Sequence, residues 1–288
     1  MRNLWLAALA VCLIASGAWA QGSGVSTARS LGMGGAVIGV ADDAAAWYQN
    51  PAGLAALNVP VQEGKLWGAD VAGIYASQDT SGGSIDSWGL LGSGWQPAKR
   101  MGFGLGFGDV EDYVTIIGGG FGMGIGDTEL SAGISIVNQD YDDVLIPAQT
   151  GYSGGSDTLL NLGFLYRVAR EEGSPVRLGL LVEDLTDETD MGPWFSAGVA
   201  WPATPEWLVA LDLRDITDES DNGPYLSGGV EYKPAKLANW AFRAGLADDG
   251  EDHNLTVGAG YAWERWRLDA AYGDVADGVW SITGSLGF

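Results

Sequence analysis

The chain has 288 residues, of which 37 are Asp or Glu and 14 are Lys or Arg, so its formal net charge is -23. This charge makes nucleic acid an implausible partner, because nucleic-acid binding depends on clustered basic residues. A composition with 46 Gly and 13 Trp favours one large β domain. The only cysteine, Cys12, leaves the rest of the chain without disulfides or cysteine-based metal sites.

Residues 1–20 have the form of a secretory signal peptide. Arg2 precedes the apolar run 4–14, and Ala18-Trp19-Ala20 has the small-x-small form of a cleavage site. No later stretch approaches the roughly 20 continuous apolar residues that a membrane helix requires. We therefore expect a secreted chain in which any membrane insertion uses strands, with an N-terminal segment at 21–60 and a β domain at 61–288.

The segment 21–60 has no strand-like alternation of apolar and polar residues. Asp42 is placed to cap a short helix that runs through Tyr48, and Asn50-Pro51 is placed to cap and begin a second one. The glycines between residues 32 and 39 permit close backbone approach. We expect this segment to fold separately from the strands.

Period-two alternation bounded by turn residues then predicts fourteen strands. Most are 9–13 residues long, which is close to the 9–11 residues that a tilted strand needs to cross a membrane. The expected ranges are 65–77, 84–97, 100–108, 113–126, 128–138, 157–168, 176–184, 193–201, 206–215, 223–233, 238–247, 253–263, 266–273 and 278–288.

The third and fourth of these strands carry glycine at nearly every second position. One face of each strand is therefore almost bare backbone, which leaves room beside the strands and makes them easy to bend. We expect this face either to receive the N-terminal segment or to form a bent wall. The residues are Gly102, Gly104, Gly106, Gly120, Gly122 and Gly124.

An internal repeat supports this series of hairpins. The run 184–194 recurs as 215–225, a shift of about 31 residues, which is the length of one hairpin with both connections. Such regularity predicts an all-β, transmembrane, antiparallel up-and-down β-barrel of about 14 strands. Alternation alone does not say which face is inside, but aromatic residues beside alternate turns resemble an interfacial girdle. The face opposite the apolar one carries Asp212, Arg214, Glu231 and Arg243.

Charges in the connections separate by position. Acidic residues fill the connections after odd-numbered strands, whereas basic residues such as Lys99, Lys233 and Arg265 lie in those after even-numbered strands. This pattern is expected if the two sets of connections lie at opposite ends of one barrel. The acidic turns 187–190 and 218–221 lack the EF-hand spacing, so we expect solvated loops, with divalent cations bridging them to lipopolysaccharide as a second hypothesis.

The last nine residues alternate and end on an aromatic carboxy terminus. Trp280, Leu286 and Phe288 are expected to face lipid on the closing strand and to form a signal for the barrel-assembly machinery. The sole histidine, His253, lies in an acidic turn and has no partner for a catalytic or metal site. We therefore expect no enzyme activity and no cofactor.

The segment 28–54 resembles the N-terminal signature of the FadL-like outer-membrane family and its PorV/PorQ-like relatives. The shared pattern is Ala-Arg-x-Leu-Gly-Met-Gly-Gly-Ala, then Ala-Asp-Asp-Ala, then Asn-Pro-Ala-Gly-Leu. The resemblance implies a 14-stranded barrel with the N-terminal segment as a lumenal plug. Its motif residues here are Asp42, Asp43, Asn50, Pro51, Ala52 and Gly53.

The resemblance implies an outer-membrane barrel that binds or transports small hydrophobic compounds such as fatty acids, with the glycine strands as a possible lateral opening. Lumenal charges would hold the plug. Short loops favour an alternative, a PorV-like scaffold or shuttle for secreted or surface-attached proteins. A general diffusion porin is a third class. The expected partners are outer-membrane lipid and lipopolysaccharide, the barrel-assembly machinery, and either a hydrophobic small molecule or a secretion-system protein.

Overall fold

The computed structural model describes residues 26–57, 61, 64–80, 83–111, 114–141, 155–187, 193–217, 224–248, 253–274 and 278–288. The expected signal peptide, most of the 139–156 connection and most of the two acidic turns at 187–190 and 218–221 lie outside these ranges. So does the side chain of His253. No helix within the described ranges is long and apolar enough to cross a membrane.

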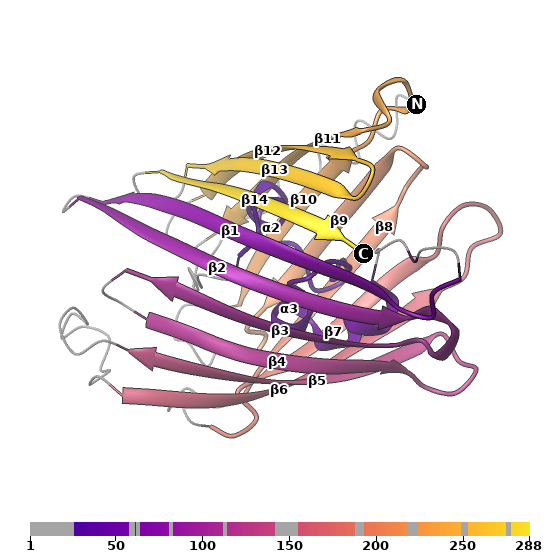
Figure 1. Cartoon of the computed structure of the whole chain (residues 1–288), viewed down its shortest axis with the longest axis horizontal. Coiled ribbons are helices and arrows are strands. Elements are labelled where there is room, and N and C mark those ends of the chain that lie inside the picture. Colours follow the sequence, from indigo (N-terminus) through magenta and orange to yellow (C-terminus); the bar gives the residue numbers. More distant parts are fainter. Residues whose placement is uncertain are drawn as a thin grey trace.

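The described residues form a closed antiparallel barrel, in which each strand pairs with its neighbours in sequence and the last strand pairs with the first (Figure 1). The predicted fold class is therefore confirmed. The strands are β1 (Gly68–Thr80), β2 (Gly83–Gln96), β3 (Met101–Val110), β4 (Val114–Gly124), β5 (Leu130–Tyr141), β6 (Gly155–Val168), β7 (Val176–Glu183), β8 (Trp194–Pro202), β9 (Trp207–Arg214), β10 (Tyr225–Tyr232), β11 (Trp240–Asp248), β12 (His253–Trp263), β13 (Trp266–Gly273) and β14 (Val279–Gly287).

Each predicted strand has its counterpart, and the largest shift is at β1, which begins at Gly68 and not at residue 65. Alternation sorts the two faces of each strand. On β3, Phe103 and Leu105 are 47% and 59% exposed on the outer surface, whereas the glycines that alternate with them, Gly102, Gly104 and Gly106, are buried in the lumen. Because the outward side chains are apolar on most strands, the barrel presents an apolar surface of the kind that contacts lipid.

The N-terminal segment fills the lumen. It forms α2 (Ala28–Gly32), α3 (Ala46–Gln49) and the 3-10 helix η1 (Pro51–Ala56), and Figure 1 shows these coils inside the ring of strands. Helix α2 packs against β11 to β14, whereas η1 packs against β2 to β6. We call residues 26–57 the plug.

Two sectors of the lumen differ in polarity. Around β1 to β6, apolar wall residues pack on the fully buried Trp47 of α3. Around β8 to β13, the buried lumenal residues include charges that meet the other side of the plug. The apolar wall residues are Ile74, Leu91, Ile116, Val137 and Leu159, and the charged ones include Asp212, Glu231, Arg243 and Asp269.

The two ends of the barrel also differ. Phe288 and the connections after even-numbered strands lie at one end, which we call the turn end. The connections after odd-numbered strands lie at the other, the loop end. Aromatic side chains stack at the turn end: the ring centroids of Trp207 and Tyr232 are 4.4 Å apart, and those of Trp263 and Trp266 are 6.2 Å apart.

Candidate functional site: the plug and its lumenal wall

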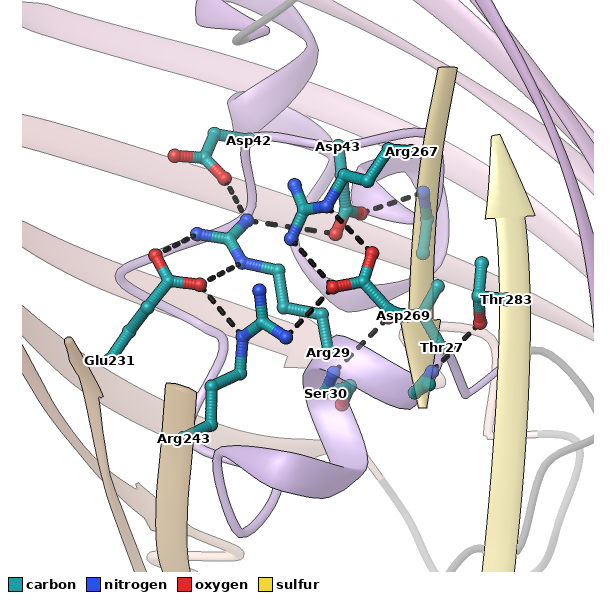
Figure 2. A network of polar contacts seen from close by, with 12 residues as sticks. Thr27, Arg29, Ser30, Asp42, Asp43, Glu231, Arg243, Arg267, Asp269 and Thr283 are labelled. Atoms are coloured by element: carbon teal, nitrogen blue, oxygen red, sulfur yellow. Dashed lines mark hydrogen bonds and ion pairs between the residues drawn. The ribbon is translucent and has the colours of Figure 1, made fainter. Parts of the chain in front are cut away.

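Arg29 of α2 is the centre of the contacts between plug and barrel. Its side chain is buried and forms an ion pair with Asp42 of the plug. Its Nε lies 3.1 Å from Oε2 of Glu231 on β10, and its Nη1 lies 3.7 Å from Asp43 (Figure 2). The three carboxylates raise the pKa of Arg29 well above its ordinary value although burial alone would lower it. Arg29 therefore remains a cation that joins the plug to the wall.

Glu231 extends this network along the barrel wall. Its carboxylate, 1% exposed, also accepts a 2.8 Å bond from Nε of Arg243 on β11 and pairs with Lys233 at 2.9 Å. Arg243 in turn reaches Asp269 on β13 at 2.8 Å, and Asp269 pairs with Arg267 at 2.6 Å. Two of the predicted lumen charges, Glu231 and Arg243, thus belong to one continuous chain of ion pairs over β10, β11 and β13 (Figure 2).

Asp42 does not cap a helix, contrary to the sequence-based prediction. Helix α3 begins after Ala45 with no side-chain cap, and Asp43 accepts the hydrogen bond from the Ala45 amide at 3.0 Å. Asp42 instead pairs with Arg29 and, at 3.1 Å, with Arg177 on β7. Burial alone would raise the pKa of Asp42, but these two guanidinium groups hold it well below its ordinary value. The carboxylate of Asp42 therefore forms ion pairs and does not cap the helix.

Asp212 and Arg214 of β9 hold the middle of the plug. The fully buried Asp212 accepts hydrogen bonds from the backbone N–H groups of Val37 and Ile38 at 2.6 and 2.8 Å. Arg214 donates to the carbonyl oxygen of Gly35 at 3.0 Å. These bonds satisfy backbone groups of an irregular segment that would otherwise be buried without partners.

The Asn-Pro-Ala-Gly motif fixes the end of the plug. Asn50 caps η1 by accepting a hydrogen bond from the Ala52 amide, and its side chain donates to the carbonyl oxygens of Ile38 at 3.0 Å and Phe164 of β6 at 3.3 Å. Pro51 begins η1, as predicted. A Cβ at Gly53 would overlap the carbonyl oxygen of Ala41, so only glycine allows this close approach.

The glycine face of β3 and β4 is the surface on which Trp47 lies. A Cβ at Gly106 would come within 2.5 Å of the indole Cζ2, and one at Gly104 within 3.0 Å of the Trp47 Cβ. Gly120 also faces Trp47, whereas Gly102 and Gly122 face the backbone of η1. Gly124 instead receives the side chain of Arg100. The glycines suggested as a lateral opening are thus mostly covered from inside by the plug.

The closing strand places Trp280 and Phe288 on the outer surface, at 39% and 41% exposed, with Leu286 half-buried. Trp280 lies opposite Ser77 of β1, and its ring contacts that of Tyr75 in a tilted arrangement with a centroid distance of 5.2 Å. The backbone of Phe288 exchanges hydrogen bonds with that of Ala69. The last residue is therefore part of the seam that closes the barrel.

No protein-family model and no curated protein sequence matches the chain. Its structure is similar to that of the Ralstonia pickettii toluene transporter TbuX, with 13% identity, a TM-score of 0.59, and coverage of 91% of this chain and 97% of that chain. The Pseudomonas putida toluene transporter TodX is similar at 14% identity and a TM-score of 0.53, with 91% and 96% covered. A Pseudomonas aeruginosa FadL homologue is similar at 12% identity and a TM-score of 0.53, with 91% of this chain and 98% of that chain covered.

The fold is that of the FadL-type outer-membrane barrels. Within this FadL-type fold, the sequence placed Arg177 and Asp269 on the face opposite the apolar one but did not identify Arg29 as a member of the site. Arg29 stands in the motif, but its partner Glu231 is 202 residues away, and no local pattern predicts that pairing. The one available signal was the presence of charges on the inward face of several strands, because buried charges require partners. Within the described ranges no cluster of three or more metal-ligating side chains is present.

Proposed function

We propose that this protein lies in the bacterial outer membrane and carries small hydrophobic compounds, fatty-acid-like molecules among them, past its plug. It does no covalent chemistry. The similar structures include proteins described as toluene transporters, which supports the proposal at the level of the fold. In this account residues 1–20 are cleaved on secretion, and the closing strand with Trp280, Leu286 and Phe288 directs assembly of the barrel.

One observation carries the proposal. The lumen contains a continuous apolar sector in which Trp47 belongs to one buried cluster with side chains from five strands. A lumen made for water and ions is polar, whereas this sector offers an apolar molecule an environment that excludes water. The sector is closed by packing in this structure, so passage requires that the plug move.

The contacts of the plug indicate which part moves. The segment 43–49 lies between Asp42 and Asn50, both of which are bonded to the barrel wall. Within it, the indole N–H of Trp47 has no acceptor among the described residues, so apolar packing holds the ring. Packing lacks directed bonds, and a hydrophobic ligand can replace it with little loss.

The scaffold function is the second candidate, and the same contacts favour it in one respect. Ion pairs and amide hydrogen bonds hold the plug to β6, β7, β9 and β10, which is what a fixed, non-conducting barrel requires. In that case the exposed loops and not the lumen would bind a secreted or surface-attached protein. Lipopolysaccharide bound through cations to the acidic loops is compatible with both functions.

The molecules that co-purify with the protein distinguish the two functions. The barrel is extracted from outer membranes in mild detergent, and the bound molecules are identified by mass spectrometry. We expect a retained hydrophobic compound at near one molecule per barrel, and less of it after Trp47→Asp, which places a charge in the apolar sector. A stoichiometric protein partner with no retained hydrophobic compound would support the scaffold and contradict transport.

A further inference from the structure

A cavity opens at the turn end of the barrel, away from Trp47. Its volume is about 270 Å³, and it lies between the plug and the wall formed by β11 to β14 and β1. A single water needs only about 15 Å³ of such space, so the cavity is large enough for a small organic group. Residues from the β10–β11 and β12–β13 turns line its mouth.

Two basic residues lie at the mouth, beside aromatic side chains. Lys233 and Arg265 line the cavity and are exposed to solvent at its rim, where the exposed Glu264 leaves one net positive charge. Trp240 and Trp266 line the same rim and are 40% and 48% exposed. Tryptophan in this position marks the membrane interface, and basic residues there meet lipid phosphates.

The floor of the cavity carries carboxylates with few partners. Asp43 of the plug is 3.7 Å from Arg29 and otherwise accepts one backbone hydrogen bond, and Asp70 of β1 makes no ion pair with a described residue. The other deep acids, Asp42 and Asp269, are already neutralised by arginines. Arg267 also lines the floor but pairs with Asp269, so the negative charge in excess of the floor arginines belongs to Asp43 and Asp70.

We propose that this cavity binds the phosphoethanolamine headgroup of a membrane phospholipid. The phosphate lies at Lys233 and Arg265, the ammonium group lies deeper at Asp43 and Asp70, and the acyl chains leave over the rim at Trp240 and Trp266. Positive charge at the mouth and negative charge at the floor match the two ends of this zwitterion. An anionic headgroup would satisfy only the mouth, and a trimethylated ammonium group would offer the floor no N–H donor.

The inference depends on the membrane location but not on transport of hydrophobic compounds, so either can fail alone. Whole barrels are reconstituted in nanodiscs that contain phosphatidylethanolamine, phosphatidylcholine and phosphatidylglycerol in equal amounts, and the lipids retained on the protein are counted by native mass spectrometry. We expect phosphatidylethanolamine to be retained in excess. Asp70→Asn and Arg265→Gln should each reduce that excess about tenfold, as expected for loss of a charge-assisted hydrogen bond.

The matched controls are Asp127→Asn and Lys99→Gln, which remove the same charges from other turns at the same end of the barrel and should leave retention unchanged. Lys233 is kept, because it also pairs with Glu231. Mobility on unheated gels shows that each variant is folded. Equal retention of the three lipids, a preference for phosphatidylglycerol, or unchanged retention in Asp70→Asn would overturn the proposal. Equally tight binding of soluble glycerophosphoethanolamine would overturn its assignment to a lipid.

Discussion

Asp212 shows how single side chains, and not helices, hold the plug. The plug helices are only four to six residues long, and isolated helices of that length have little stability of their own. The backbone between α2 and α3 is instead ordered by one carboxylate on the wall that accepts from two amides. The stability of the plug therefore depends on a few buried polar contacts.

We expect Asp212→Ala to destabilise the protein by about 2 kcal/mol, because two buried amides lose their acceptor. Asp212→Asn keeps one acceptor oxygen and should have a smaller effect. Thermal unfolding followed by circular dichroism measures both. Equal stability of Asp212→Ala and the wild type would mean that the plug does not need this bond.

Trp47 and the glycine that faces it should be energetically coupled. A side chain at residue 106 would overlap the indole, so Gly106→Val should cost about 1 to 3 kcal/mol through overpacking. Trp47→Ala should cost about 3 to 5 kcal/mol by leaving a cavity. The double variant should be more stable than the sum of the two single effects implies. If the loss of unfolding free energy in the double variant equalled the sum of the losses in the two single variants, the two residues would not be in contact.

Acid should weaken the plug through Asp42. A carboxyl whose pKa is lowered in the folded state stabilises the fold above its unfolded pKa of about 4, and this contribution is lost as the pH falls further. Asp42→Asn should therefore reduce the free energy of unfolding at pH 7 by about 3 kcal/mol. The free energy of unfolding of this variant should also fall less than that of the wild type between pH 7 and pH 3. Asp43 is the control, because burial raises its pKa and its ionisation opposes folding. Thermal unfolding should show that Asp43→Asn, which retains Asp42, does not lower the stability at pH 7 and keeps the loss of stability between pH 7 and pH 3.

Among the elements, strands were predictable and plug contacts were not. A strand such as β3 can be predicted from its local sequence, because the outward-facing Phe103 and Leu105 alternate with small inward-facing residues. The Asn50 cap was likewise local. Asp42 was misassigned because the residues that decide its role, Arg29 and Arg177, come from α2 and β7, and only closure of the barrel brings them together. Long-range pairing of this kind leaves no period in the sequence.

Removal of the plug should open the lumen. A variant that lacks residues 26–57 leaves the glycine face and the charged wall without cover, and the barrel should then conduct ions in planar lipid bilayers. The intact protein should conduct far less. High conductance of the intact protein would contradict a closed plug and would favour a diffusion porin.

At the scale of the whole molecule, the barrel combines an apolar outer surface with a lumen divided into an apolar sector and a charged sector. The charged sector holds α2 and the middle of the plug, whereas the apolar sector holds Trp47 by packing alone. This division lets one part of the plug stay anchored while another part moves. The central claim is that such movement admits a hydrophobic compound.

A reversible crosslink between plug and wall tests this claim most directly. An ideal Cβ at Gly120 lies 3.3 Å from the Cβ of Trp47, slightly below the roughly 3.5 to 4.5 Å of a disulfide, so a small shift of the plug allows the bond. The only native cysteine is Cys12 of the expected signal peptide. Cells that produce the Trp47→Cys, Gly120→Cys variant are given labelled fatty acid or toluene. We predict uptake when the pair is reduced and loss of uptake when it is oxidised. Equal uptake in both states would contradict the account.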